Sequence, residues 1–478
     1  MLKVRYCFWS LLVVSLMMIV SSCSDSKQDY VCVIPNDATA VVGMDLNSLA
    51  LKSELGSSSA ITTLKKYMGV FISTDARTKM ETLINDPSLS GLDFSQPAYM
   101  FMTPNQCVGL TFKVDDCSML ENIIETLARQ GICSGIKEHD GYQWSTLMDD
   151  INICFSDNTL LLMTQLEGTA MSGSARLQSL MLSLMQMPSE ESFASGDCFR
   201  RMNSQECGDI QFYANLAAVP SEYMQNVKLP LPVGARYSDI QLVGGADFNK
   251  GGAMLKTQLY SDSEKVQKMI DDIYSSFKPI EGQFTDNAGD YICFTAGVNG
   301  GKILNYLKAI PQVKEYLIGA NLALDCDNII KSFDGDILFC MNGGNSYSLY
   351  AHMGNADVMK DIDDWKQSAE EYGFGFSEVG SNQYRIIVDD NDWFMAYSKE
   401  TLYVGSEARE LSNGTKSDRL PEEQKGRNIF VNVNMKDRYP LVDKVVITSS
   451  GVGEMTYVID MRDKSENILK ILLGQWKL

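Results

Sequence analysis

Residues 239–260 read DIQLVGGADFNKGGAMLKTQLY, and this stretch decides the fold. Two runs rich in apolar residues flank Asn249-Lys250-Gly251-Gly252, and asparagine and glycine in this position are typical of a turn between antiparallel strands. Residues 444–461 show the same pattern around Ser450-Gly451-Val452-Gly453. The sequence therefore predicts two long hairpins of the same kind, which indicates an internal repeat.

A common order of elements surrounds each hairpin. In the first half we expect strand 38–46, helix 61–70, strands 97–102 and 107–114, helix 120–128, strands 142–147, 151–164 and 209–216, the hairpin, and helix 266–277. The second half gives strand 290–298, helix 300–309, strands 335–341 and 347–353, helix 358–372, strands 383–388, 392–404 and 428–435, the hairpin, and helix 468–476. We predict an α+β fold, a tandem duplication of a mostly antiparallel sheet-plus-helix unit at 30–280 and 285–478.

Residues 168–207 form an insertion in the first unit, because the equivalent stretch of the second unit, 406–427, is shorter and polar. The insertion contains an apolar, methionine-rich helix at 177–187. Methionine adapts to irregular apolar partners, so this helix could line a binding groove. The weak ligand-binding candidates are Met181, Met185 and Met187. The alternative is that the helix caps a sheet edge or fills the seam between the halves.

The first residues have the order of a lipoprotein signal peptide. Two basic residues precede an apolar run at 6–20 that is shorter than a membrane-spanning helix, and two serines then precede Cys23. This pattern predicts a signal peptide at 1–22, lipidation of Cys23 and a short tether at 23–29. The alternative is an ordinary secretory signal with a chance cysteine, or an uncleaved anchor.

The net charge of the chain limits the kinds of partner that we expect. The formal net charge is −20, and the predicted cleavage removes two basic residues and no acidic one, which leaves −22. Such a field repels a polyanion, so we expect no nucleic-acid partner. We expect the protein to reach the membrane through its lipid and to lie at the outer membrane, on its periplasmic face or at the cell surface.

Metal and cofactor motifs are weak. Most of the ten cysteines after Cys23 lie in or beside apolar runs, where cysteine packs as a small hydrophobic residue, and no CxxC or Cys/His spacing for zinc occurs. Asp389, Asp390 and Asp392 concentrate carboxylates in a short turn and are weak calcium candidates, although the twelve-residue loop of a calcium-binding hand is missing. We predict no cofactor.

No catalytic motif stands out either. Residues 297–302, GVNGGK, lie between a strand and a helix, but their glycine spacing is too short for a phosphate loop and Ile303 stands where Ser or Thr is needed. His139 and His352 could each act as a general base, yet neither lies in the context of a known nucleophile motif. A tight strand-to-helix turn, and histidines that lie at the surface or in the core, are the better interpretations.

Residues 30–46, YVCVIPNDATAVVGMDL, followed by Ser48-Leu49, resemble the start of a large uncharacterised family of Bacteroidetes cell-envelope lipoproteins. In that family a proline, an aspartate and an alanine open a strand that ends in Asp-Leu, shortly behind the lipidated cysteine. The resemblance runs over the full mature length. It implies a Gram-negative envelope protein with a full-length domain of unknown function, and it supplies no catalytic residues.

Our first hypothesis is a non-catalytic envelope protein that binds a partner protein or a small apolar ligand in a groove between its halves. A cell-envelope hydrolase with an unidentified carboxylate site is the second hypothesis, and a structural scaffold is the third. A closed polar pocket with two close carboxylates would favour the hydrolase over the binding protein, and a featureless cleft would indicate the scaffold. The oligomeric state is left open by the sequence.

Overall fold

The computed structural model describes residues 29–54, 86–147, 150–165, 174–218, 231–284, 291–321, 324–342, 346–388, 391–411 and 420–475. The chain divides into two compact units, which are Met1–Ala214 with Leu469–Leu478 (unit 1) and Asn215–Ile468 (unit 2). Each unit consists of an antiparallel sheet with helices packed on it, so the predicted mixed α and β class is confirmed. None of the helices in the described part of the chain has the length and apolar character that crossing a bilayer requires.

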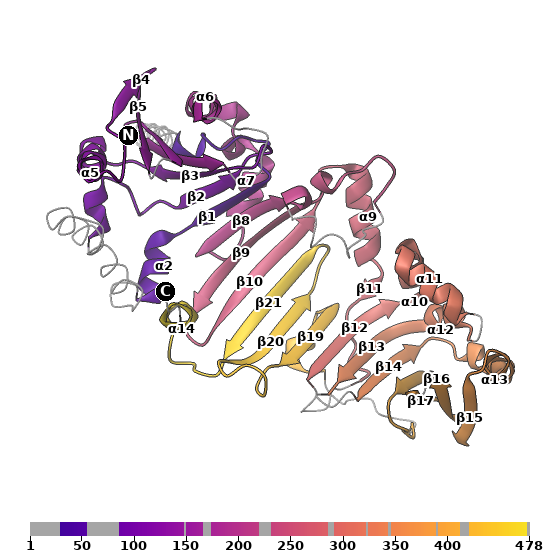
Figure 1. Ribbon diagram of the computed structural model, residues 1–478. Helices are drawn as coiled ribbons and strands as arrows, with labels where there is room; N and C mark the ends of the chain where they lie inside the picture. The colour runs from indigo at the N-terminus through magenta and orange to yellow at the C-terminus, as the bar shows by residue number, and fades with distance from the viewer. Residues whose placement is uncertain are drawn as a thin grey trace, which may run out of the picture. The chain divides into compact units, whose positions relative to one another are not determined.

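In the described residues of unit 1, eight strands form the sheet, part of which can be followed in Figure 1. They are β1 (Ala40–Met44), β2 (Ala98–Met102), β3 (Cys107–Lys113), β4 (Lys137–His139), β5 (Tyr142–Leu147), β6 (Ile151–Phe155), β7 (Thr159–Gln165) and β8 (Ile210–Asn215). Their order across the sheet is β8-β1-β2-β3-β7-β6-β5-β4, and every neighbouring pair is antiparallel. The long predicted strand 151–164 is the hairpin β6–β7, bent at the expected place.

The helices of unit 1 are α2 (Leu46–Ser53), α5 (Cys117–Arg129), α6 (Ser174–Met185) and α7 (Asp197–Asn203), with α14 (Ile468–Gln475) at the end of the chain. Helix α5 begins where Asp116 accepts a hydrogen bond from the Met119 backbone N–H at 3.0 Å. Its apolar face places Leu120 and Ile124 in a cluster with Phe155. The predicted helical face at 120–128 therefore covers the sheet as expected.

The chain turns into helix α2 directly after β1. Asp45, which the sequence placed inside the first strand, accepts a hydrogen bond from the Ser48 N–H at 2.8 Å and begins the helix. We did not predict this helix, because it is short and only weakly amphipathic. The helix expected at 61–70 lies outside the described residues.

Unit 2 contains the two hairpins. Its strands are β9 (Gln241–Asn249), β10 (Gly252–Tyr260), β11 (Phe277–Lys278), β12 (Ile292–Asn299), β13 (Phe333–Met341), β14 (Tyr347–Met353), β15 (Gly375–Gly380), β16 (Gln383–Val388), β17 (Asn391–Tyr397), β18 (Thr401–Gly405), β19 (Ile429–Asn434), β20 (Val442–Ser449) and β21 (Glu454–Met461). Their order is β9-β10-β21-β20-β19-β12-β13-β14-β18-β17-β16-β15, with β11 also beside β12.

The two hairpins are joined edge to edge. Strand β10 pairs antiparallel with β21 over seven residue pairs, from Gly252 with Asp460 to Gln258 with Glu454 (Figure 1). Hydrogen bonding between hairpins that the sequence separates by almost 200 residues explains why the compact units do not coincide with the predicted repeat units. The first hairpin, β9–β10, packs with the second half of the chain.

The helices of unit 2 are α9 (Glu264–Tyr274), α10 (Gly300–Ala309), α11 (Pro311–Ala320), α12 (Cys326–Lys331) and α13 (Ile362–Glu371). Helices α10 and α12 contact strand β13, and Trp365 of α13 lies in a buried cluster with Met353, Met395 and Leu402. We did not predict α11 and α12. Single 3-10 turns occur at Asp29–Val31, Pro87–Ser90, Ser189–Glu191, Phe193–Ser195, Leu216–Ala218, Tyr237–Asp239, Asp357–Asp361 and Glu422–Gln424.

The glycine-rich segment 297–302 is the turn from β12 into α10. Asn299 begins the helix by accepting a hydrogen bond from the Lys302 N–H at 3.0 Å. A Cβ atom on Gly300 would lie 1.9 Å from the carbonyl oxygen of Ile330, so only glycine lets α12 approach this closely. The segment is thus the strand-to-helix turn that the sequence indicated, and the structure adds that Gly300 is needed for packing.

Candidate functional site

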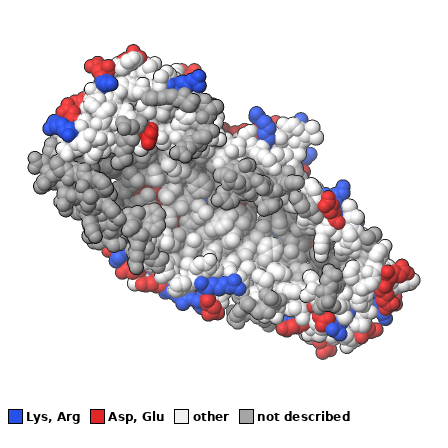
Figure 2. Space-filling view, viewed as in Figure 1, with Lys and Arg blue, Asp and Glu red and all other residues white. Residues whose placement is uncertain are grey.

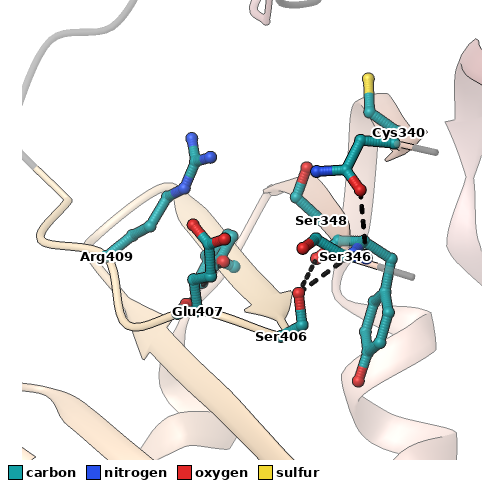
Figure 3. Close-up of a pocket in the computed structure, with 9 residues that line it drawn as sticks. Cys340, Ser346, Ser348, Ser406, Glu407 and Arg409 are labelled. Carbon is teal, nitrogen blue, oxygen red and sulfur yellow. Dashed lines mark hydrogen bonds between the residues drawn. The ribbon is translucent and has the colours of Figure 1, made fainter. Parts of the chain in front are cut away.

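A pocket opens in unit 2 where β13, β14 and β18 lie side by side (Figure 3). It has an empty volume of about 300 Å³, which includes its open mouth. The residues that line it come from the ends of these strands and from the segment that follows β18. They are Cys340, Asn342, Ser346, Tyr347, Ser348, Tyr403, Ser406, Glu407 and Arg409.

Tyr403 forms the buried wall of the pocket. Its ring is almost fully buried and its centroid lies 5.0 Å from that of Tyr350, and its hydroxyl donates to the Glu407 carbonyl oxygen at 2.7 Å. Burial raises the pKa of Tyr403, so this hydroxyl keeps its proton near neutral pH. A Cβ on Gly405 would lie 2.2 Å from the same hydroxyl, so glycine at this position makes room for it.

Arg409 brings a positive charge to the pocket. Its guanidinium donates from Nη1 to the Tyr350 hydroxyl at 2.8 Å, and its central carbon lies 5.9 Å from the centre of the Tyr403 ring. Burial alone would lower the pKa of Arg409, but the neighbouring Tyr350, Tyr403 and Glu407 groups raise it above its ordinary value. The guanidinium is therefore charged at every physiological pH, and its remaining N–H groups are available to a ligand.

Hydrogen bonds fix the polar rim of the pocket (Figure 3). Ser406 Oγ accepts from the Tyr347 N–H at 3.1 Å and donates to the Tyr347 carbonyl oxygen at 3.3 Å. The side-chain oxygen of Asn342 accepts from the Ser346 N–H at 3.2 Å. These bonds tie the end of β18 to the start of β14, so the polar groups hold their positions before any ligand arrives.

Glu407 adds a negative charge to the same pocket. Its side chain is exposed, and Figure 3 shows it on the same side of the chain segment as Arg409. No ion pair within 4.0 Å joins Glu407 or Arg409 to each other or to another residue of the described ranges. Two opposite charges therefore face one small pocket without neutralising each other directly.

Sequence reasoning missed this pocket. Its residues come from segments that are separate in the sequence, and none of them belongs to a known motif. The only local signal is the alternation of small polar and bulky residues in 346–350, SYSLY, which is typical of a strand with one distinct face. Glu407 and Arg409 come to lie beside this strand only after β18 pairs with β14.

The methionine candidates lie elsewhere, on helix α6 of unit 1. Met181 is fully buried and Met185 is half-buried where the helix packs on β6 and β7. Met187 is half-buried just beyond the end of the helix. None of the three lines the pocket, and their role in ligand binding stays a prediction.

The calcium candidates are only partly described. Asp389 and Asp390 lie outside the described residues, as does the predicted lipidation site, Cys23. Both carboxylate oxygens of Asp392 accept from the Arg385 guanidinium, at 2.7–3.0 Å. In the ranges that the structure describes, no three His, Cys, Asp or Glu side chains gather in a way that could hold a metal ion.

The two histidines take structural positions. His139 is exposed, and its Nδ1 lies 2.9 Å from the carboxylate of Asp140, its neighbour in the chain. His352 lies on β14, and its Nδ1 is 2.9 Å from the Asp334 carbonyl oxygen. Neither ring lines the pocket.

The segment that resembles a family motif builds the core of unit 1. Tyr30 is buried, and its hydroxyl donates to the Pro97 carbonyl oxygen at 2.8 Å. Ser48 and Lys52 of α2 both donate to the buried carboxylate of Asp209, at 2.6–2.7 Å. The contacts of these motif residues stabilise the fold, which is a sufficient physical reason for their presence.

Charged side chains are mixed on the surface. On the face shown in Figure 2, acidic and basic residues lie in small groups beside one another, and no broad basic patch appears among the residues coloured there. The described ion pairs Arg129–Glu125, Arg200–Asp197 and Lys444–Glu423 are of this exposed kind.

Comparison with known proteins gives a family and little more. A family model described as Domain of unknown function (DUF4836) matches residues 30–462. No curated protein matches the chain. Among solved structures, "Structure of crystal form I of TP0453" is 10% identical, with a TM-score of 0.28 over 51% of this chain and 83% of that chain. "Structure of crystal form III of TP0453" is 12% identical, with a TM-score of 0.28 over 52% and 86%. TM-scores of this size do not establish a common fold.

Proposed function

The chain belongs to the DUF4836 family, and we propose that it is a lipid-anchored envelope protein that binds a small ligand in the Arg409 pocket without transforming it. The single observation that carries the binding function is the convergence of preorganised polar groups from separate strands on one pocket. A guanidinium held by the Tyr350 hydroxyl can give orientation and affinity to a polar ligand before the ligand arrives.

The anchor is proposed from the sequence. Lipid on Cys23 would hold the protein at the outer membrane, on its periplasmic face or at the cell surface. Tyr30 is already buried, and only six residues separate it from Cys23. Six extended residues span at most about 20 Å, so the proposed tether would keep the folded part close to the bilayer.

The anchor is tested by metabolic labelling with a fatty acid in the native host. We expect the Cys23→Ser variant to lose the label and to leave the membrane fraction. The matched control, Cys326→Ser, removes a cysteine within the folded part and should keep both. Label that persists on the Cys23→Ser variant would contradict the proposal.

The binding function is tested on the full mature chain, extracted from its own membranes in detergent. Native mass spectrometry should detect a small molecule that remains bound to the protein. The Ser346→Trp substitution places a large ring at the rim of the pocket and should remove this molecule, whereas Ser377→Trp on the exposed strand β15 should not. Equal retention in both variants would contradict binding at this pocket, and chemical turnover of the molecule would favour the hydrolase.

We also propose that residues 30–280 and 285–478 arose by tandem duplication. The order β8-β1-β2-β3-β7-β6-β5-β4 in unit 1 has the same form as β19-β12-β13-β14-β18-β17-β16-β15 in unit 2. Corresponding hairpins also match in length: β6–β7 pairs Phe155 with Leu160, and β17–β18 pairs Tyr397 with Leu402, each five positions apart. Both observations support a common origin of the two halves.

The hairpin contact supports the same proposal. In the β10–β21 pairing Leu255 lies opposite Tyr457, and Gly252 lies opposite Asp460 while Gln258 lies opposite Glu454. β10 and β21 are each the second strand of their hairpin, so the contact joins equivalent strands antiparallel, like the contact of two equal subunits about a two-fold axis. An experimental structure in which the strands of the two halves follow different orders would contradict the duplication.

A further inference from the structure

We propose that the Arg409 pocket takes a small zwitterion, with Arg409 binding its anionic group and Glu407 its ammonium group. This inference rests on the proposed binding function and names the chemical class of the ligand. The shared chemistry is an anion and an ammonium group a few bonds apart, as in a free α-amino acid or in the phosphoethanolamine headgroup of a lipid.

The first step is the pair of charges. Arg409 and Glu407 both line the pocket, and they form no ion pair within 4.0 Å with each other or with another described residue. A simple anion would be attracted by Arg409 but repelled by Glu407. A simple cation would be attracted by Glu407 but repelled by Arg409. A ligand that carries both charges gains from both residues, which gives specificity as well as affinity.

The second step is the way Arg409 is held. The Tyr350 hydroxyl accepts one N–H group from Nη1, and the central carbon of the guanidinium lies over the Tyr403 ring, 5.9 Å from its centre. The fork of remaining N–H groups suits a carboxylate or phosphate, which accepts two parallel hydrogen bonds. An anchored guanidinium loses less freedom on binding than a mobile one.

The third step is the size and polarity of the space. The empty volume of about 300 Å³ includes open solvent at the mouth, so the enclosed space is smaller and fits only a small ligand. The Ser348 hydroxyl and the Asn342 amide add neutral hydrogen-bonding groups beside the charges. Together these features fit a compact, strongly polar molecule better than the apolar ligand that the sequence suggested.

The test uses isothermal titration of the full mature chain with four probes. L-alanine and glycerophosphoethanolamine are zwitterions, L-alaninamide is only a cation and N-acetyl-L-alanine is only an anion. We expect at least one zwitterion to bind about tenfold or more tightly than both single-charge probes, a difference of about 1.4 kcal/mol. Preference for glycerophosphoethanolamine would assign the site to a lipid headgroup, and preference for L-alanine to a free amino acid.

Variants assign each charge to its partner. Arg409→Gln should weaken binding of the zwitterion about tenfold and change the affinity for L-alaninamide by less than twofold. Glu407→Gln should weaken binding of the zwitterion about fivefold, because an exposed carboxylate contributes less, and should change the affinity for N-acetyl-L-alanine by less than twofold. The controls Arg462→Gln and Glu410→Gln change exposed residues outside the pocket and should have no effect. Arg409→Lys keeps the positive charge and should retain part of the affinity if the variant is folded.

The outcomes separate this inference from the binding function. Equal binding of the zwitterions and N-acetyl-L-alanine, or the same loss in Arg409→Gln for all probes, would overturn the zwitterion assignment. If no zwitterion binds while the molecule retained from native membranes is still displaced by Ser346→Trp, the inference fails and the binding function stands. If Ser346→Trp changes no binding at all, the binding function itself fails.

Discussion

The buried ion pair of unit 1 gives the sharpest prediction, because its two partners differ in their access to water. The carboxylate of Asp209 is 3% exposed, whereas the side chain of Lys52 is 31% exposed. Lys52 Nζ donates to both carboxylate oxygens, at 2.6 and 2.7 Å, and Ser48 Oγ donates to one of them at 2.6 Å. Removal of the lysine takes the Lys52 ammonium group away from a buried charge, but removal of the acid leaves an ammonium group that can turn toward solvent.

We therefore expect Lys52→Met to lower the free energy of unfolding more than Asp209→Asn does. Breaking a buried pair at one partner costs roughly 3–5 kcal/mol, and the partial exposure of Lys52 sets the loss at the lower end, at about 3 kcal/mol. The Asp209→Asn variant keeps a polar side chain for Ser48 and should lose about 1.5 kcal/mol.

The measurement is urea unfolding followed by circular dichroism. The two variants are compared with the same value for the slope of unfolding free energy against urea concentration. The matched control is Arg129→Met, which breaks an exposed pair with Glu125 and should cost at most about 0.5 kcal/mol. An equal loss for Lys52→Met and Asp209→Asn, or the reverse order, would refute the argument from burial.

Three further substitutions test other parts of the fold. Gly300→Ala should destabilise the protein by about 3 kcal/mol in urea unfolding, because the new Cβ would lie 1.9 Å from the Ile330 carbonyl oxygen. The control is Gly301→Ala, whose new Cβ has its nearest neighbour at 3.6 Å, and it should be neutral or stabilising by up to about 1 kcal/mol. Asp336→Ala should cost about 3 kcal/mol in the same assay, because this fully buried carboxylate accepts two backbone N–H groups that would lose their partner; a loss below about 1 kcal/mol would contradict this. Burial, and to a smaller extent the nearby carboxylates, raises the pKa of Cys117 from 9.0 to about 11. The stabilisation that this thiol contributes is therefore complete below pH 9 and is lost as the pH rises through 11. Alkylation of the native protein by iodoacetamide should accelerate over the same pH range, and Cys117→Ser should remove this part of the loss of stability at alkaline pH.

The sequence by itself determined the local elements of this protein. The turn at 249–252 sets the hairpin β9–β10, and the apolar spacing from Leu120 to Ala128 sets helix α5, because turn geometry and helical periodicity depend on residues close together in the chain. Short elements escaped this reasoning. Helix α11 begins with Pro311, which is a known start signal, but the helix is short and only weakly amphipathic.

Only the tertiary structure decided which strands became neighbours. Nothing near Leu255 in the sequence indicates that β10 pairs with β21, or that β18 lies against β14, since the partners are chosen by the burial and hydrogen bonding of the whole sheet. The pocket depends on that choice, because Arg409 meets the Tyr350 hydroxyl only after β14 and β18 are paired. Short-range chemistry therefore set the elements of this chain, and long-range pairing set the pocket in which Arg409 meets the Tyr350 hydroxyl.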